Sequence, residues 1–413
     1  MFPGSSIIAT LTLAIAVAAN PLVQVRDTPI TLSAAKRFNF TGSASLLERD
    51  QARVKGLRQL AEAKISGKLN EDAVISTPAT NQAVDYVVNV AVGSPATTYS
   101  LLVDTGSSNT WVGAGKVYVR TGTSTQTNDR VSVTYGSGSF SGTEFTDTVS
   151  LGSSLTIQRQ SIGVASRSQG FNGVDGILGI GPVDLTTGTL SPDTSSTVPT
   201  VTDNLFSQGV ITQNLVAVSF EPTTSLSSTN GELTFGGTDS SKFTGSISFA
   251  PITRTSPASE FWGIDQTIRY GASTSILSST AGIVDTGTTL TLIASDALRR
   301  YQTATGAVLD NNTGLLRLTP AQFANLQSLF FTVNGATFEL TANAQAWPRS
   351  LNTAIGGNTN SVYLIVADLG SNSGEGLDFI NGLTFLERFY SVFDTANRRV
   401  GLATTSFTHA TTN

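Results

Sequence analysis

Two aspartates, Asp104 and Asp285, stand 181 positions apart in nearly the same seven-residue context. The first context runs Leu-Val-Asp-Thr-Gly-Ser-Ser over 102–108, and the second runs Ile-Val-Asp-Thr-Gly-Thr-Thr over 283–289. Each copy places an aspartate after an apolar run and before a glycine that permits a tight turn. One Asp-Thr-Gly would be weak evidence in a chain rich in Thr and Gly. Two copies of the longer pattern predict two related units that each contribute one carboxylate.

The chemistry of such a pair follows from electrostatics. Two carboxylates a few ångströms apart cannot both ionise cheaply, so they share a proton and titrate as a unit. The ionised member can act as a general base on water, while the protonated member polarises a carbonyl and later helps to protonate the leaving amine. We therefore predict that Asp104 and Asp285 form one acid-active hydrolytic site that needs no cofactor and no metal ion.

The residues after each aspartate have supporting roles that follow from their types. Gly106 and Gly287 allow close packing at the turns. The hydroxyls of Ser107 and Thr288 can donate hydrogen bonds to the carboxylates. The two threonines of the Asp-Thr-Gly motifs could hydrogen-bond across the interface between the units and fix the geometry: Thr105 and Thr286. Ordinary turn chemistry is an equally good reading of any one of these hydroxyls taken singly.

Composition excludes most competing chemistries. The chain has no cysteine, and its one histidine, His409, lies in a Thr-rich tail that we expect to be frayed. Thiol catalysis, a Ser-His-Asp triad and Cys- or His-based metal sites are therefore excluded. Charged residues make up only 13% of the chain, and the abundance of Ser, Thr and Gly favours a mainly β fold. We expect neither a nucleic-acid partner nor a membrane.

The length of 413 residues favours two lobes, one for each motif. The apolar run Ile7–Ala18 ends in small residues, so residues 1–19 resemble a secretory signal peptide, too short to span a bilayer. We therefore expect a secreted, extracellular protein.

A basic segment follows, with nine basic and six acidic residues between Pro21 and Asp72, while the rest of the chain carries a net charge of −8. Part of this segment, Ser45–Leu69, has helix-like composition, and alternating strands begin near Val84. We predict that residues 20–72 form a propeptide that covers an acidic cleft. A solvated basic linker explains the charge alone equally well.

The body reads as many short strands separated by turns. We expect helices at Val201–Phe206, Asp296–Tyr301 and Pro320–Leu326, and a loop at Thr223–Gly231. This loop marks the expected division into an N-terminal lobe, 73–225, and a C-terminal lobe, 226–413.

Further motifs make the chain resemble the pepsin-like aspartic endopeptidases over nearly all of residues 84–403. They are the hairpin Val133–Ser139 (VTYGSGS), the segment Gly173–Gly181 (GVDGILGIG) and the C-terminal segment Tyr390–Ala403. The resemblance implies a bilobal fold with two pseudo-symmetric β lobes and a cleft between them. It also implies a monomer that cleaves protein or peptide substrates at bulky apolar residues, and a mature chain that begins close to Ala73.

The resemblance also implies roles for individual residues. Tyr135 would lie at the tip of a flap with its hydroxyl toward Trp111, and Gly136 would offer backbone hydrogen bonds to the substrate. Ile177 would lie near a side-chain pocket. Several fungal relatives carry Asp at Ser137, so we expect poor cleavage after lysine. The remaining residues assigned to substrate binding are those at the motif turns: Gly106, Gly287 and Thr288.

The chain departs from the family pattern in the second lobe. Asn381 stands where an apolar residue is usual, and Leu383 where many relatives carry Asp. We expect both to alter substrate pockets on the C-terminal side and to leave the aspartate pair alone. The sequon at Asn311 is a candidate N-glycosylation site in the body.

Three other functions fit parts of the sequence. A non-catalytic binding or inhibitor protein could share the fold, but the intact Asp104, Asp285 and Tyr135 argue against it. A glycosidase also uses two carboxylates, yet rarely needs two symmetric copies of one motif. A Ser/Thr-rich β-sandwich adhesin would not explain the duplication.

Overall fold

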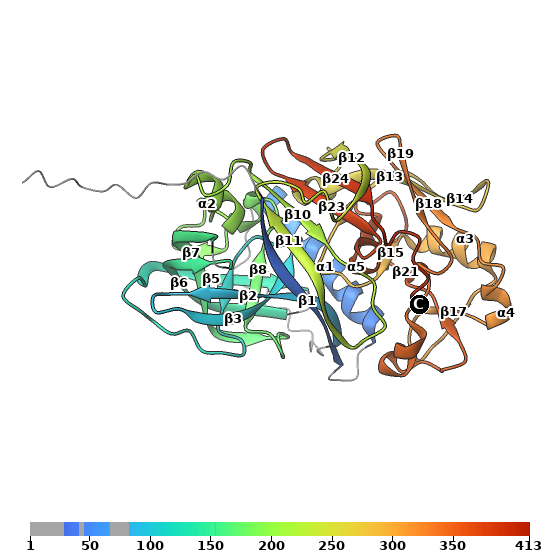
Figure 1. Ribbon diagram of the computed structural model, residues 1–413, viewed down its shortest axis with the longest axis horizontal. Helices are drawn as coiled ribbons and strands as arrows, with labels where there is room; N and C mark the ends of the chain where they lie inside the picture. The colour runs from blue at the N-terminus through green and yellow to red at the C-terminus, as the bar shows by residue number, and fades with distance from the viewer. Residues whose placement is uncertain (1–28, 41–44, 67–81, 137, 153) are drawn as a thin grey trace, which may run out of the picture.

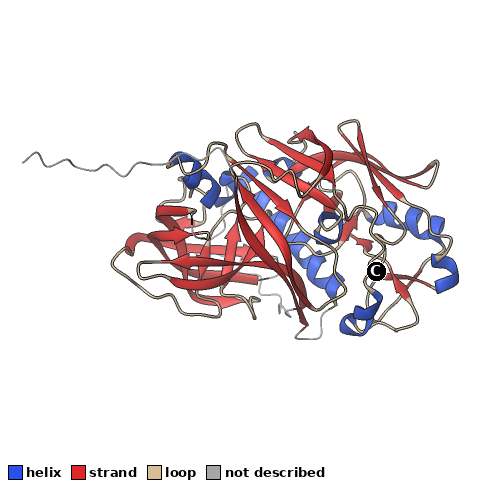
Figure 2. Ribbon diagram, in the orientation of Figure 1, coloured by secondary structure: helices blue, strands red, loops and turns tan. Residues whose placement is uncertain are grey.

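The computed structural model describes residues 29–40, 45–66, 82–136, 138–152 and 154–413. The expected signal peptide, the expected end of the propeptide at residue 72 and Ser137 lie outside these residues. Strands dominate the described part, with most of the short helices at its periphery and one long helix inside it (Figure 2). The expectation of a mainly β, two-lobed fold is confirmed.

The first lobe belongs to a sheet with the strand order β12-β24-β23-β10-β11-β1-β2-β3-β8-β4-β7-β6-β5-β9. Its strands from the first lobe are β2 (Gln82–Val92), β3 (Thr97–Asp104), β4 (Trp111–Val112), β5 (Thr125–Tyr135), β6 (Gly138–Ser150), β7 (Thr156–Gln169), β8 (Gly176–Gly179) and β9 (Leu190–Ser191). The others are β1 (Ile30–Phe40), β10 (Leu215–Ser219), β11 (Ser227–Phe235), β12 (Thr244–Pro251), β23 (Phe389–Asp394) and β24 (Arg399–Thr404). Strands from both ends of the chain thus meet in one sheet that connects the lobes.

The second lobe has a sheet with the order β19-β18-β13-β14-β22-β15-β21 and a small sheet β16-β17-β20. The strands are β13 (Gly263–Tyr270), β14 (Thr274–Val284), β15 (Thr291–Ile293), β16 (Val308–Leu309), β17 (Leu316–Leu318), β18 (Leu329–Val333), β19 (Ala336–Leu340), β20 (Val362–Tyr363), β21 (Val366–Asp368) and β22 (Phe379–Asn381). In both lobes the strand before the aspartate pairs in parallel with a short strand, β3 with β8 and β14 with β22. The two aspartates therefore lie at equivalent strand ends in the two lobes.

The α-helices of the described residues are α1 (Leu46–Ser66), α2 (Val201–Ser207), α3 (Ser295–Thr305), α4 (Pro320–Phe323) and α5 (Leu383–Leu386). Four of these five helices lie where the sequence predicts them, and α5 was not expected. Helix α1 begins with a capping box, in which the backbone N–H of Ser45 donates to Glu48 and that of Glu48 donates to the Ser45 hydroxyl. Figure 1 shows α1 in the middle of the molecule, with β2–β8 on one side and the strands of the second lobe on the other.

The expected loop at Thr223–Gly231 is correct only for residues 223–226, because β11 begins at Ser227. Its first residues pair with the basic segment, with Ser227 opposite Arg37 and Thr229 opposite Ala35 in β1. A polar, turn-like tract becomes a strand because a partner strand far away in the sequence satisfies its backbone.

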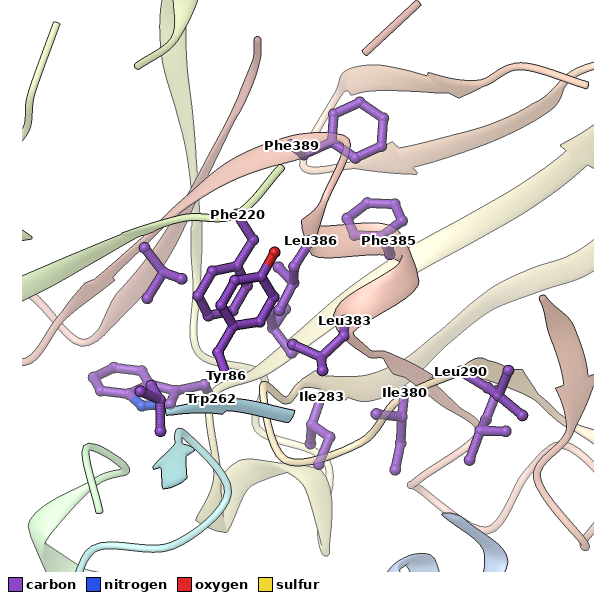
Figure 3. Close-up of a cluster of buried hydrophobic side chains, with 14 of the residues drawn as sticks. Tyr86, Phe220, Trp262, Ile283, Leu290, Ile380, Leu383, Phe385, Leu386 and Phe389 are labelled. Carbon is purple, nitrogen blue, oxygen red and sulfur yellow. The ribbon is translucent and has the colours of Figure 1, made fainter. Parts of the chain in front are cut away.

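The core beneath the second aspartate is rich in aromatic and branched side chains. Figure 3 shows Ile283 and Ile380 side by side, with Leu383 above them. Tyr86 stacks on Phe220 with a centroid separation of 3.6 Å. These fully buried side chains give the loop after β14 a rigid base.

The C-terminal tail is docked rather than frayed, which corrects our expectation. Arg388 donates to the carbonyl groups of Phe407 and Ala410 at 3.1 and 2.8 Å, and the buried Thr408 hydroxyl donates to the Arg388 carbonyl. His409 itself is exposed. In the described part of the chain, no helix is both long enough and apolar enough to cross a membrane.

Candidate active site

The two Asp-Thr-Gly loops meet face to face and exchange hydrogen bonds symmetrically. The backbone N–H of Thr105 donates to the Thr286 hydroxyl at 3.0 Å, and that of Thr286 donates to the Thr105 hydroxyl at 2.9 Å. Each hydroxyl in turn donates to the other lobe, Thr105 to the carbonyl of Val284 and Thr286 to that of Val103. Four interlocking bonds thus fix the two loops relative to each other.

Both carboxylates are fully buried and receive equivalent hydrogen bonds. In the first loop, the Gly106 N–H and the Ser107 hydroxyl donate to Asp104 at 2.9 and 2.5 Å. In the second loop, the Gly287 N–H and the Thr288 hydroxyl donate to Asp285 at 3.1 and 2.6 Å. The donors hold each carboxylate in one orientation.

The glycines matter because the loops approach closely. A Cβ on Gly106 would lie 2.7 Å from a carboxylate oxygen of Asp285, and a Cβ on Gly287 would lie 2.6 Å from one of Asp104. Each glycine therefore leaves room for the aspartate of the other lobe.

Arg53, from helix α1 of the basic segment, lies between the two aspartates. Its Nη2 contacts Asp104 at 2.5 Å and Asp285 at 2.9 Å, and its Nε contacts the other oxygen of Asp285 at 2.6 Å. The guanidinium therefore bridges both carboxylates and is bidentate on Asp285. It is itself 5% exposed, so the charges compensate one another away from solvent.

The guanidinium makes the two aspartates inequivalent. Burial raises the pKa of Asp104, a rise that the Arg53 charge opposes and the nearby Asp285 reinforces. Burial acts in the same direction on Asp285, but the charge and hydrogen bonds of Arg53, together with the Thr288 hydroxyl, hold its pKa below the ordinary value. With α1 in place, Asp285 is therefore the more strongly ionised of the two.

Other cations of the basic segment also pair with carboxylates of the body. Arg49 contacts Asp85 at 3.1 Å, Arg58 contacts Glu375 at 2.9 Å, and Lys64 contacts Glu260 at 3.1 Å. A buried ion pair joins β1 to the segment after α5: Lys36 with Glu387. Five cations of the basic segment thus form ion pairs with carboxylates of the body: Lys36, Arg49, Arg53, Arg58 and Lys64.

One acidic residue of α1 also contacts the second loop. Asp50 accepts hydrogen bonds from the backbone N–H groups of Thr289 and Leu290 at 3.3 and 2.7 Å. Burial raises its pKa to about 6, although Arg49 and the two backbone donors act in the opposite direction. Helix α1 therefore holds the Asp285 loop from two sides.

Tyr135 ends β5 at the tip of the expected flap, and its ring is buried. It lies edge-on to Phe171 with centroids 5.5 Å apart, while Trp111 stacks on Phe140 at 4.2 Å. Burial, followed by the charge of Asp104, raises the pKa of the Tyr135 hydroxyl well above its ordinary value. Trp111 and Ser107 act against this rise, yet the hydroxyl and the Trp111 indole form no hydrogen bond of good geometry within the described residues.

With α1 in place, little free space remains beside the aspartates. One cavity of about 20 Å³ is lined by Leu57 of α1 together with Gly106, Ser107, Tyr135 and Leu185. A second cavity of the same size is lined by Arg53, Tyr135, Phe171, Ile177 and Gly287. Each has room for about one water molecule. Ile177 thus lines the same small cavity as the flap residue Tyr135.

Sequence reasoning missed several residues of this site. The basic charge of the segment indicated Arg53 only as one of nine cations, and its position on the same helix face as Arg49 was the available signal. Asp50, Phe171 and Leu185 gave no local signal. In the part of the chain that the structure describes, no three His, Asp or Glu side chains group as metal ligands.

Comparisons with known proteins agree with this geometry. A model of the eukaryotic aspartyl protease family matches residues 85–405. Polyporopepsin of Irpex lacteus is 81% identical over 338 residues, covering 82% of this chain and 99% of that protein. Rhizopuspepsin-1 of Rhizopus niveus is 32% identical over 371 residues, 86% of this chain and 89% of that one. The crystal structure of an aspartic proteinase from Irpex lacteus matches with a TM-score of 0.79 and 81% identity, covering 81% of this chain and 98% of that chain.

Proposed function

Because this chain belongs to the eukaryotic aspartyl protease family and is an aspartic-type endopeptidase, we propose that it is made as a secreted zymogen of an acid protease. Its proposed catalytic residues are Asp104 and Asp285, and its proposed inhibitor is its own residues 20–72. The observation that carries the proposal is the guanidinium of Arg53, which occupies the space between the two carboxylates.

In the proposed reaction, a water molecule takes the place of the Arg53 guanidinium once the proposed propeptide, residues 20–72 (the leader), has been removed. The ionised aspartate removes a proton from this water as its oxygen bonds to the peptide carbonyl carbon. The protonated aspartate donates its proton to the carbonyl oxygen, which gives a tetrahedral diol. Collapse of the diol breaks the C–N bond. The aspartate that took a proton from water passes it to the leaving amine nitrogen, and the other aspartate regains a proton from a hydroxyl of the diol. The hydrogen bonds from Ser107 and Thr288 keep both carboxylates oriented throughout.

Several contacts support the pairing of propeptide and body. Helix α1 fills the space beneath the flap residue Tyr135, and the cations of the leader pair with carboxylates of the body. The match to polyporopepsin covers nearly all of that protein yet leaves about 75 residues of this chain without a counterpart. A leader that ends close to residue 72 accounts for this difference.

The remaining features of the proposal concern the whole chain. The leader would follow a signal peptide at residues 1–19, and the mature enzyme would begin near Ala73 and comprise lobes 73–225 and 226–413. Its substrates would be proteins or peptides with bulky apolar residues beside the scissile bond, which Ile177 and the flap residues Tyr135, Gly136 and Ser137 would contact. We further propose a secreted monomer that carries a glycan at the exposed Asn311.

Digestion of a peptide library between about pH 2 and pH 8, with and without a statine-type transition-state mimic such as pepstatin, tests this function. We expect cleavage in acid that the mimic abolishes, and no cleavage by Asp104→Asn or Asp285→Asn protein with unchanged circular dichroism. Asp184→Asn, at an exposed position of the first lobe, is the matched control and should retain activity. Full activity of either dyad variant would refute the proposed site.

A further inference from the structure

A fully buried pair of amide side chains lies behind the Asp285 loop. Gln266 is on β13 and Asn381 ends β22, the two strands that flank β14. The Asn381 Nδ2 donates to the Gln266 Oε1 at 2.9 Å, and the Gln266 Nε2 donates to the Asn381 Oδ1 at 3.3 Å. Asn381 is 0% exposed and Gln266 is 1% exposed. The pair therefore connects two strands across the one that carries Asp285 at its end.

The first lobe has apolar residues at the same two places. Leu178 and Asn381 pair with the residue directly before the aspartate in each lobe, so they are counterparts. Val90 and Gln266 pair with the residue five positions before the aspartate in each lobe, so they are counterparts too. Leu178 and Val90 are fully buried in the main apolar core. The fold can thus be built without amides at these positions, so the pair in the second lobe needs another explanation.

Asn381 also supports Asp285 through the backbone. The Asp285 N–H donates to the Asn381 carbonyl at 3.2 Å. Two residues further on, the Leu383 N–H donates to the Thr288 carbonyl at 2.8 Å. The position of β22 therefore determines the position of the Asp285 loop.

We propose that the Gln266–Asn381 pair is a positioning element for Asp285, an inference that rests on the proposed catalytic role of that aspartate. Apolar packing is non-directional, whereas two reciprocal hydrogen bonds in a dry site fix both strands in one arrangement. Proton sharing between two carboxylates depends on their separation, and small displacements of a reacting group slow the reaction. Our expectation that Asn381 leaves the aspartate pair alone is therefore replaced by its opposite.

The test is the double variant Gln266→Val/Asn381→Leu, which copies the first lobe. Either single variant leaves one buried amide without its partner, so each should melt at a lower temperature than the double variant. After acid activation, the double variant should lose at least about tenfold in kcat with KM changed by less than about twofold, because binding pockets are untouched but the aspartate is displaced. Its pH–rate profile should shift, since the profile reports the shared titration of the pair.

The control is Gln345→Leu, which removes another fully buried amide of the second lobe. Gln345 bonds to backbone carbonyls of Gln327 and Leu340. It should lower the melting temperature and leave kcat and the pH profile unchanged. A profile shift in this control, or a wild-type kcat and profile in the double variant, would overturn the proposal.

Two further measurements keep the outcome decisive. If the double variant does not fold, Gln266→Met/Asn381→Leu retains the side-chain length at position 266 and is judged by the same criteria. An active Asp285→Asn protein would refute the proposed function itself, whereas an inactive Asp285→Asn combined with a wild-type double variant would refute the positioning role alone.

Discussion

Gly56 of helix α1 and Gly136 of the flap hairpin lie backbone against backbone. A Cβ added to Gly56 would overlap the Gly136 backbone, and a Cβ added to Gly136 would overlap the Ala52 carbonyl. Helix α1 can lie this deeply under the flap because neither residue has a side chain. If residues 20–72 are removed as we propose, the contact exists only in the uncleaved chain, since that cleavage would remove Gly56.

Gly56→Ala tests this contact against a competing effect. Alanine favours an isolated helix by about 1 kcal/mol over glycine, so propensity alone predicts a more stable leader. Packing predicts the reverse, because the new methyl group forces α1 away from the flap. We expect Gly56→Ala protein to activate at a higher pH than wild type, measured as cleavage of a quenched peptide after stepwise acidification.

The matched control is Lys55→Ala, a substitution at the neighbouring exposed position. It should activate at the wild-type pH. The mature enzymes released from all three proteins should have equal kcat and KM. Activation of Gly56→Ala at a lower pH than wild type would show that helix propensity, rather than the contact with Gly136, decides how firmly α1 docks.

Arg53 should determine the pH at which the leader is released. Arg53 holds the pKa of Asp285 below its ordinary value, so this ion pair stabilises docking above that ordinary value and is lost as the pH falls below it. Removal of one partner from a buried ion pair costs about 3–5 kcal/mol. We therefore expect Arg53→Gln protein to activate at a higher pH than wild type, within the acid range in which the aspartate pair is active, and Arg53→Lys to be intermediate because lysine lacks the bidentate fork.

Arg37→Gln provides the comparison for this series, because Arg37 is an exposed leader cation on β1. It lowers the charge of the leader equally without touching the aspartates, and its activation pH should stay at the wild-type value. Mass spectrometry of the N-terminus after stepwise acidification measures the activation pH. Equal shifts of that pH in Arg37→Gln and Arg53→Gln would mean that total charge, rather than the Arg53 contact, controls release.

The sequence predicted what its local patterns specify. The duplicated motif predicted that Asp104 and Asp285 belong together, because each copy carries its own strand end, turn glycine and hydroxyl donor. The helices α1 to α4 were predicted within a few residues for the same reason, whereas α5 was not predicted. These features depend on neighbours a few positions apart.

The features that were missed depend on residues far apart in the chain. The first residues of β11 are polar and gave no strand signal. They form a strand because β1 of the basic segment pairs with them. Arg53 could not be selected from nine leader cations without knowing how α1 docks. We expected Asn381 to alter a substrate pocket, and its hydrogen bond to Gln266, 115 positions away, was not foreseen. Buried polar groups are explained by their partners, which a pattern search does not identify.

The buried Glu144 on β6 should make the fold less stable at neutral pH than in acid. It is 2% exposed, and burial raises its pKa to about 7 although the Ser161 hydroxyl donates to it. Since the pKa is higher in the folded than in the unfolded state, the protonated carboxyl stabilises the fold fully below about pH 4.5, and this stabilisation is lost as the pH rises through about 7. Glu144→Gln, which is neutral at every pH, should raise the free energy of unfolding by about 2–3 kcal/mol at pH 8 and leave it unchanged at pH 4. Thermal denaturation at both pH values measures the difference.

Glu339→Gln, at a half-buried glutamate that accepts a similar bond from Ser328, should show no such pH-dependent gain, and an equal gain there would refute the assignment to burial of Glu144.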